Sequence, residues 1–319
     1  MDAIHTLLTE TNNPATAGIS GCSTLEMLRL INDEDKKVAP AVERELPHIA
    51  DAVDRIAARL HPGKSVEGAE TPAEDGSAPA PTQDIGAGTS GRLAVVDASE
   101  CRCTYGVPTD LVQAILAGGL EGIGDAAQGD EDDAAMGREE IRCRRAGAGD
   151  AVVGITASGR TPYVLGAIAQ ANEAGCLTVG LCSNPDTALS RLATVTIAPL
   201  TGPEAIEGST RMKSGTAQKM VLNMLSTGVM IRLGKVYGNR MVDMDANNEK
   251  LRARAARMVT DITGCPAEEA AARLTLCGYD VKRAVASLWL DCGVGEAAER
   301  LAAAGGSLEA LRATERGGV

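Results

Sequence analysis

The sequence predicts an α/β fold in which helices flank a parallel sheet, and three observations support this prediction. Short apolar runs at 151–155, 177–181 and around 195–197 alternate with helical segments, which is the repeat of strand, loop and helix. Glycine- and serine-rich turns follow such runs or open the helices. The 319 residues, 44% of them hydrophobic, can bury a sizeable core. We therefore expect a doubly wound sheet with ligands at the carboxyl ends of its strands.

The first 60 residues are expected to form an N-terminal helical segment. Ser23 is followed three residues later by Glu26, a capping box that starts a helix. The apolar stripe of the next helix repeats at spacings of four and three, at Val42, Leu46, Ile49, Val53, Ile56 and Leu60. Its partner surface is either the following domain or a second subunit, and packing in the core is the simpler explanation.

Residues 61–84 are expected to form a surface insertion, because they are rich in Pro, Ala, Gly and acids and contain almost no large apolar side chain. Only Ile85 is then left to form an apolar strand before the next turn, so the first strand has the weakest support in the sequence. Beyond it, the pattern over 108–117 predicts a helix that ends at Gly118, and the acidic run 130–133 leads into another helix.

Three loops with small and hydroxyl side chains fall within the domain expected over residues 85–235, each at a strand end or a helix start. Backbone N–H groups, hydroxyls and a helix dipole together favour an anion, usually phosphate. One such loop is compatible with an ordinary connection, but three converge on a single anionic ligand. The expected phosphate- or sugar-binding residues are Gly88, Thr89, Ser90, Thr156, Ser158, Gly159, Arg160, Thr161, Ser209, Thr210 and Lys213.

Residues 236–319 are expected to form a helical C-terminal module with one apolar face and no catalytic set. The net charge of −12 argues against nucleic acid as a partner. No apolar run is long enough to cross a membrane and the first residues lack a signal-peptide pattern, so we expect a cytoplasmic protein. The nine cysteines are interpreted as free thiols, and with only three histidines in the chain no metal site is expected.

Two glutamates are candidates for acid–base chemistry, because Glu100 and Glu131 each lie just downstream of a loop or turn. A solvated carboxylate is the alternative for each.

Long motifs in the chain resemble the N-acetylmuramic acid 6-phosphate etherase family, from about residue 13 to the end apart from the insertion. They are NPATAGIS, STLEMLRLINDEDKKV, GAGTSGRLAVVDASEC, TASGRTPYVLGA and GPEAIEGSTRMKSGTAQKMVLNMLSTG with KVYGNRMVD. The resemblance implies a sugar isomerase (SIS) domain between N-terminal helices and a C-terminal module resembling a ubiquitin-associated domain. It implies a homodimer without metal or organic cofactor. The implied reaction, in cell-wall sugar recycling, splits the substrate's lactyl ether with water into N-acetylglucosamine 6-phosphate and D-lactate.

The resemblance also implies that Glu100, in the DASE motif, and Glu131 form the catalytic pair. Glu100 is expected to protonate the departing lactate oxygen and Glu131 to remove the C2 proton of the ring-opened sugar, with the reverse assignment left open. The sequence departs from the family at the insertion and at Cys101–Cys103. Two alternatives are a non-catalytic sugar-phosphate sensor resembling glucokinase regulatory protein and a phosphosugar isomerase of SIS type.

Overall fold

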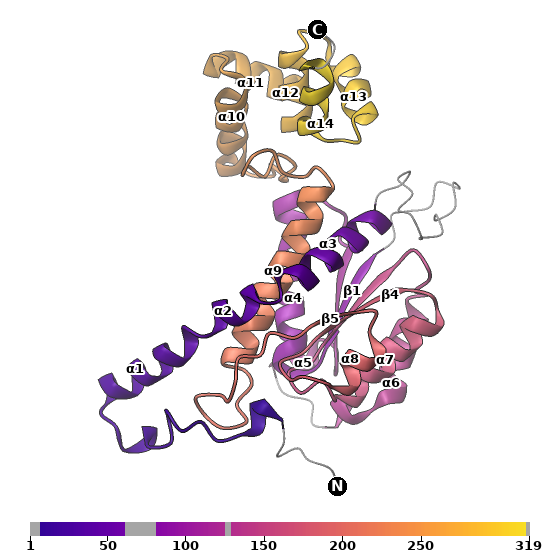
Figure 1. Cartoon of the computed structure of the whole chain (residues 1–319). Helices are drawn as coiled ribbons and strands as arrows, with labels where there is room; N and C mark the ends of the chain where they lie inside the picture. The colour runs from indigo at the N-terminus through magenta and orange to yellow at the C-terminus, as the bar shows by residue number, and fades with distance from the viewer. Residues whose placement is uncertain (1–6, 61–80, 125–128, 317–319) are drawn as a thin grey trace. The chain divides into compact units, whose positions relative to one another are not determined.

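The computed structural model describes residues 7–60, 81–124 and 129–316 (Figure 1). Most of the expected insertion, residues 61–80, lies outside the described residues. The chain divides into two compact units, one made of Met1–Ala98 and Asp110–Ser226, the other of Ser99–Thr109 and Thr227–Val319. The second unit thus takes in residues 99–109 and 227–235, which the sequence placed in the SIS domain.

The first unit contains a parallel sheet with helices on both faces, which confirms the predicted fold class. Its described strands have the order β2-β1-β3-β4-β5. Their bounds are β1 Thr82–Gly86, β2 Val112–Leu116, β3 Ala151–Ile155, β4 Leu177–Leu181 and β5 Val195–Ile197.

Strand β1 corrects the predicted boundary of the insertion, because its first three residues were assigned to that insertion. Thr82, Gln83 and Asp84 are all buried although they are polar. The strand pairs with β2 on one side and β3 on the other, so its backbone hydrogen bonds are satisfied on both sides. Tertiary pairing here overrides a sequence that has little strand propensity of its own.

The helix predicted over 108–117 is wrong, because residues 112–116 form strand β2. The apolar run VQAIL is only five residues long, too short to distinguish a strand from a helix by its periodicity. Pairing from Thr82↔Val112 to Gly86↔Leu116 makes it the edge strand beside β1.

Helices cover both faces of the sheet. Apolar residues of α6 (Ala134–Cys143), α7 (Pro162–Glu173) and α8 (Ala188–Leu192) share one core with Ile85, Ile115 and Val152. On the other face, α3 (Leu46–Leu60) packs against β4 and β5. Of the predicted stripe, Leu46 is 45% exposed, whereas the other five residues are buried, which confirms the core explanation for them.

The remaining helices of this unit include α1 (Thr24–Asp35), where Ser23 and Glu26 form the predicted capping box. Short elements are α2 (Val38–Glu43), α5 (Glu121–Gly124) and the 3₁₀ helices η2 (Leu8–Glu10), η3 (Ile19–Gly21) and η4 (Asp130–Asp132). Two long helices, α4 (Gly88–Tyr105) and α9 (Lys213–Arg232), begin in the first unit and end in the second.

The second unit is helical, as predicted, and has its own core. Its helices are α10 (Glu249–Thr263), α11 (Ala267–Leu276), α12 (Val281–Trp289), α13 (Val294–Ala303) and α14 (Leu308–Arg316). Trp289 meets Tyr237 edge to face at 5.5 Å between ring centroids, and the Arg312 guanidinium lies over the indole at 5.2 Å. Asp243 binds the Lys282 ammonium at 2.6 Å and that of Lys235 at 3.0 Å.

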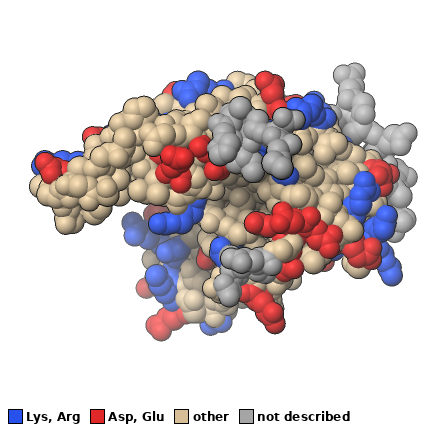
Figure 2. Space-filling view, turned by 90° about the horizontal axis from the view of Figure 1, so that it is seen from below, with Lys and Arg blue, Asp and Glu red and all other residues tan. Residues whose placement is uncertain are grey.

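None of the described helices is both long enough and apolar enough to cross a membrane. All nine cysteines are free thiols, as predicted. On the face shown in Figure 2, acidic and basic side chains are interspersed.

Candidate functional site

The carboxyl edge of the sheet brings the first two predicted loops side by side. Gly86 at the end of β1 pairs with Ile155 at the end of β3, and Ile155 pairs with Leu181 at the end of β4. The loops that start at residues 87, 156 and 182 therefore leave the sheet next to one another. This edge is where parallel sheets bind ligands.

The first loop is a turn that needs glycine at two positions. A Cβ on Gly91 would lie 2.5 Å from the Gly86 carbonyl oxygen, and Gly88 has φ +54°. Thr89 and Ser90 follow in the first turn of α4. Thr89 lies against α9, since a Cβ on Gly215 would be 3.5 Å from its methyl group. The Ser90 hydroxyl donates to Gln218 Oε1 of the same helix at 3.0 Å.

The second loop, residues 156–161, forms a cluster of hydroxyls at the start of α7. Thr156 Oγ1 lies 2.6 Å from Thr161 Oγ1 and 3.2 Å from Ser158 Oγ. Ser158 Oγ also accepts the Arg160 N–H at 3.2 Å. No side-chain hydrogen bond caps α7 at Thr161, and the first helical residue is Pro162, which has no backbone N–H group. A Cβ on Gly159 would meet the Thr187 side chain at 2.4 Å, which holds the loop close to α8.

The third loop is arranged differently from the expectation for Lys213. This side chain is 1% exposed, and its ammonium binds Glu34 Oε2 at 2.6 Å and the Thr201 carbonyl oxygen at 3.0 Å. The fully buried carboxylate of Glu204 accepts the backbone N–H groups of Lys213 and Ser214, both at 2.9 Å. A carboxylate therefore already occupies the start of α9, and the Lys213 charge is used inside the protein. Ser209 and Thr210, in the loop before α9, are partly exposed.

The N-terminal segment hydrogen-bonds to this edge of the sheet, which the sequence did not predict. Asn184 Nδ2, after β4, donates to Thr9 Oγ1 at 3.1 Å and to the Ala157 carbonyl of the second loop at 2.9 Å. Thr16 Oγ1 donates to the Ala205 carbonyl at 2.8 Å. Sequence reasoning also missed the buried partners Glu34, Glu204 and Gln218. Each contact joins segments more than a hundred residues apart, or connects a loop to a helix start, so no local pattern marks it.

Glu131 lies in the first unit with the three loops. It is exposed in η4, and η4 packs against α7. The neighbouring Asp130 is one of the charges that act on Tyr163 in the first turn of α7. The pKa of Tyr163 is raised mainly by burial and further by Glu140 and Asp130. The acidic segment and the second loop therefore both lie at the first turn of α7.

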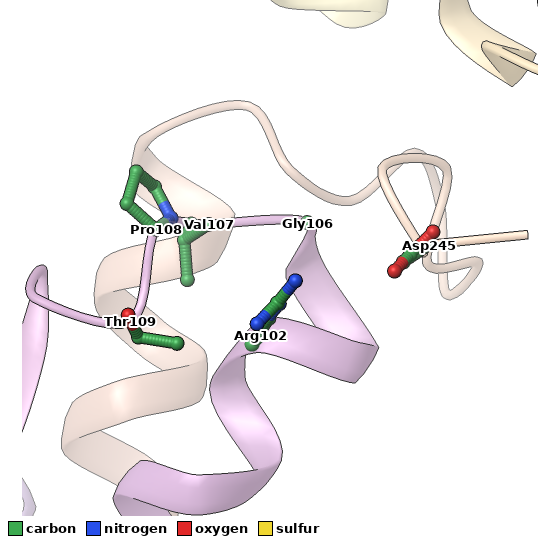
Figure 3. A pocket seen from close by; sticks show the side chains of 6 residues that line it. All are labelled: Arg102, Gly106, Val107, Pro108, Thr109 and Asp245. Atoms are coloured by element: carbon green, nitrogen blue, oxygen red, sulfur yellow. The ribbon is translucent and has the colours of Figure 1, made fainter. Parts of the chain in front are cut away.

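Glu100 is exposed in the part of α4 that belongs to the second unit. Close by in the chain, a cavity of about 580 Å³ is lined by Arg102, Gly106, Val107, Pro108, Thr109 and Asp245. Figure 3 shows Arg102 reaching it from α4 and Asp245 from a loop. Two residues along a helix differ by roughly 200° in direction. Glu100 and Arg102 therefore point to different sides of α4, and this cavity is not built around Glu100.

Comparison with known proteins gives close relatives along almost the whole chain. Family models match residues 139–228 (SIS domain) and 83–172 (Glucokinase regulatory protein N-terminal SIS domain). The N-acetylmuramic acid 6-phosphate etherase of Symbiobacterium thermophilum is 53% identical over 285 residues, which is 89% of each protein. That of Serratia proteamaculans is 47% identical over 304 residues, covering 95% of this chain and 97% of the relative. Among solved structures, a phosphoheptose isomerase from Neisseria gonorrhoeae covers 65% of this chain and 98% of its own, with 14% identity and a TM-score of 0.44.

Proposed function

The chain belongs to the N-acetylmuramic acid 6-phosphate etherase family, and from this premise we propose that it cleaves the D-lactyl ether of N-acetylmuramic acid 6-phosphate. The products are N-acetylglucosamine 6-phosphate and D-lactate, which makes the protein a carbon–oxygen lyase of cell-wall sugar recycling. The supporting observation in the structure is the hydroxyl cluster of residues 156–161 at the uncapped start of α7.

The phosphate group is proposed to bind at the adjacent first and second loops. Two hydrogen bonds within the cluster of Thr156, Ser158 and Thr161 use two of its three hydroxyl hydrogens, and the third is proposed to be donated to a phosphate oxygen. The dipole of α7 favours the negative charge at this place. Gly88, Thr89 and Ser90 lie nearby in the first turn of α4, which follows the neighbouring strand β1. Gly159 and Arg160 belong to the same loop, and Ser209 and Thr210 complete the proposed set. Lys213 is assigned instead to fixing the start of α9, because its ammonium is bound to Glu34.

The two carboxyl groups are proposed to carry out an elimination followed by addition of water. Once the sugar ring opens, the C1 aldehyde acidifies the C2 proton, which the Glu131 carboxylate removes. The electrons form the C2–C3 double bond, the C3–O bond breaks, and protonated Glu100 gives its proton to the lactate oxygen. Water then adds its oxygen to C3 and a proton to C2. A positioned acid or base contributes about 10²–10⁴-fold to such a step.

We further propose that the enzyme works as a cytoplasmic homodimer. The exposed pair Leu25 and Leu28 of α1, 58% and 54% exposed, supports association of two copies. Sedimentation of the purified chain at micromolar concentration tests the dimer, and a monomer there would contradict it.

The direct test is release of D-lactate from N-acetylmuramic acid 6-phosphate by the purified protein. We expect Glu131→Gln to lower kcat by about 100-fold or more, because it removes the base while keeping the shape of the side chain. Asp132→Asn, at the neighbouring exposed position of η4, is the matched control and keeps near-normal kcat. A folded wild-type protein that binds the phosphosugar but releases no lactate would contradict the proposed activity and leave the sensor alternative, which the etherase relatives do not favour.

A further inference from the structure

The Ser90 hydroxyl has the wrong hydrogen-bond direction for a phosphate ligand. A serine hydroxyl has one hydrogen to donate, and Ser90 donates it to Gln218 Oε1 at 3.0 Å. A phosphate oxygen only accepts at neutral pH, so it needs that same hydrogen. Ser90 is 8% exposed and Gln218 is 1% exposed, so water does not readily replace either partner.

The Gln218 amide also has unused hydrogen-bonding capacity. Its Nε2 is buried without a hydrogen-bond partner, and so is the Ser214 hydroxyl on the same face of α9, one turn earlier. A buried amide nitrogen without a partner is costly. The two ends of a glutamine amide have nearly the same shape, so a half-turn about the last side-chain bond exchanges them with little other movement.

We propose that Gln218 is a positioning residue that sets the direction of the Ser90 hydroxyl. After the half-turn, Gln218 Nε2 donates to Ser90 Oγ, and the Ser90 hydrogen is free to bind a phosphate oxygen. In the orientation described above, Ser90 Oγ instead accepts from a donor such as the 6-hydroxyl of an unphosphorylated sugar. The orientation of the Gln218 amide therefore decides whether Ser90 donates to a phosphate oxygen or accepts from a hydroxyl. This inference rests on the proposed binding of phosphate at the first loop.

The packing of α4 against α9 fixes the two side chains for this exchange. Thr89, beside Ser90, lies against Gly215, one turn before Gln218. Further along, Asn223 Nδ2 donates to Asp97 Oδ1 between the same two helices. The helices are therefore connected on both sides of the Ser90–Gln218 pair, and rotation of the amide does not require them to separate.

The test is a double-mutant cycle with Gln218→Met and Ser90→Ala. Methionine keeps the length of glutamine and removes its hydrogen bonds. We expect Gln218→Met to raise KM for N-acetylmuramic acid 6-phosphate by about 10-fold with kcat within about 3-fold, because a hydrogen bond to a charged group is weakened. In the Ser90→Ala background the same change has no further effect on KM, since Gln218 acts through Ser90. Gln170→Met, the same change on the partly exposed side of α7, is the control.

A second readout separates this inference from the proposed function. Calorimetry with inorganic phosphate and with N-acetylglucosamine 6-phosphate measures the same double-mutant cycle as binding affinities, without turnover. Gln218→Glu is expected to weaken the binding of both ligands by more than Gln218→Met, because a carboxylate only accepts hydrogen bonds from Ser90. If the wild type binds these ligands with this coupling but releases no lactate, the inference holds and the etherase function fails. If lactate is released while Gln218→Met leaves KM and Kd unchanged, or if the two changes add, Gln218 does not position Ser90. If the Gln218→Met variant does not fold, Gln218→Glu takes its place in the double-mutant cycle.

Discussion

At the scale of single residues, the strongest departure from an ordinary core is Asp84 in the middle of the sheet. It is 4% exposed in β1, between β2 and β3. Burial, and secondly the negative charge of Asp97 on α4, raise its pKa from 3.8 to about 8. In the unfolded chain the carboxyl ionises near pH 4, whereas the folded protein keeps the proton up to about pH 8.

Stability should therefore fall as pH rises between about pH 4 and 8, because the folded state binds one more proton in this window. This one group changes the free energy of unfolding by at most about 1.4 kcal/mol per pH unit. We expect Asp84→Asn to flatten this dependence and to raise the midpoint of urea unfolding at pH 8. Asp132→Asn, an exposed carboxyl, serves as the control. Equal pH slopes for the wild type and Asp84→Asn would show that Asp84 is not the titrating group.

At the scale of elements, the start of α9 depends on a buried ion pair. Lys213 has Glu34 as its charged partner, whereas Glu34 also binds Lys37 at 2.5 Å, and the Lys37 side chain is 55% exposed. Removing one partner of a buried pair typically costs about 3–5 kcal/mol. We expect Glu34→Gln to be more destabilising than Lys213→Met, because Glu34→Gln leaves the buried Lys213 ammonium without a charged partner. In Lys213→Met, the Glu34 carboxylate keeps Lys37 as its partner. The double variant should have a free energy of unfolding close to that of the wild type.

Urea unfolding followed by circular dichroism checks this order. If Lys213→Met costs as much as Glu34→Gln, Lys37 does not compensate the carboxylate. Arg29→Ala, which changes an exposed residue of the same helix α1, gives the baseline.

The elements also show what could be read from the sequence. The strands β3 to β5 and the helix starts follow from local apolar runs, caps and turns, and these were predicted. Strand β1 was expected only at Ile85 and with weak support, and β2 was predicted as a helix, because TQDIG and VQAIL become strands through pairing with each other and, for β1, with β3. Likewise, the Ser and Thr residues of the loops were visible in the sequence, but Glu204 and Gln218 act through contacts that only the fold creates.

At the scale of the whole molecule, the two units are joined through helices that are continuous. Both α4 and α9 start in the first unit and end in the second. Breaking the chain's structure at this division would interrupt both helices, and helix formation is cooperative. We therefore expect the two units to unfold together rather than in separate steps.

The single tryptophan makes this testable, because Trp289 is partly buried and packs against the core of the second unit, whereas Asp84 titrates in the first. If unfolding is one cooperative transition, the urea midpoint measured by Trp289 fluorescence should decrease as the pH rises from 5 to 8. At each pH it should coincide with the midpoint measured by circular dichroism. Asp84→Asn should then remove most of this fall in both signals, although the substitution is in the other unit. If the urea midpoint measured by fluorescence changes neither with pH nor with Asp84→Asn, the units unfold independently. Stability would then have to be assigned to each unit separately.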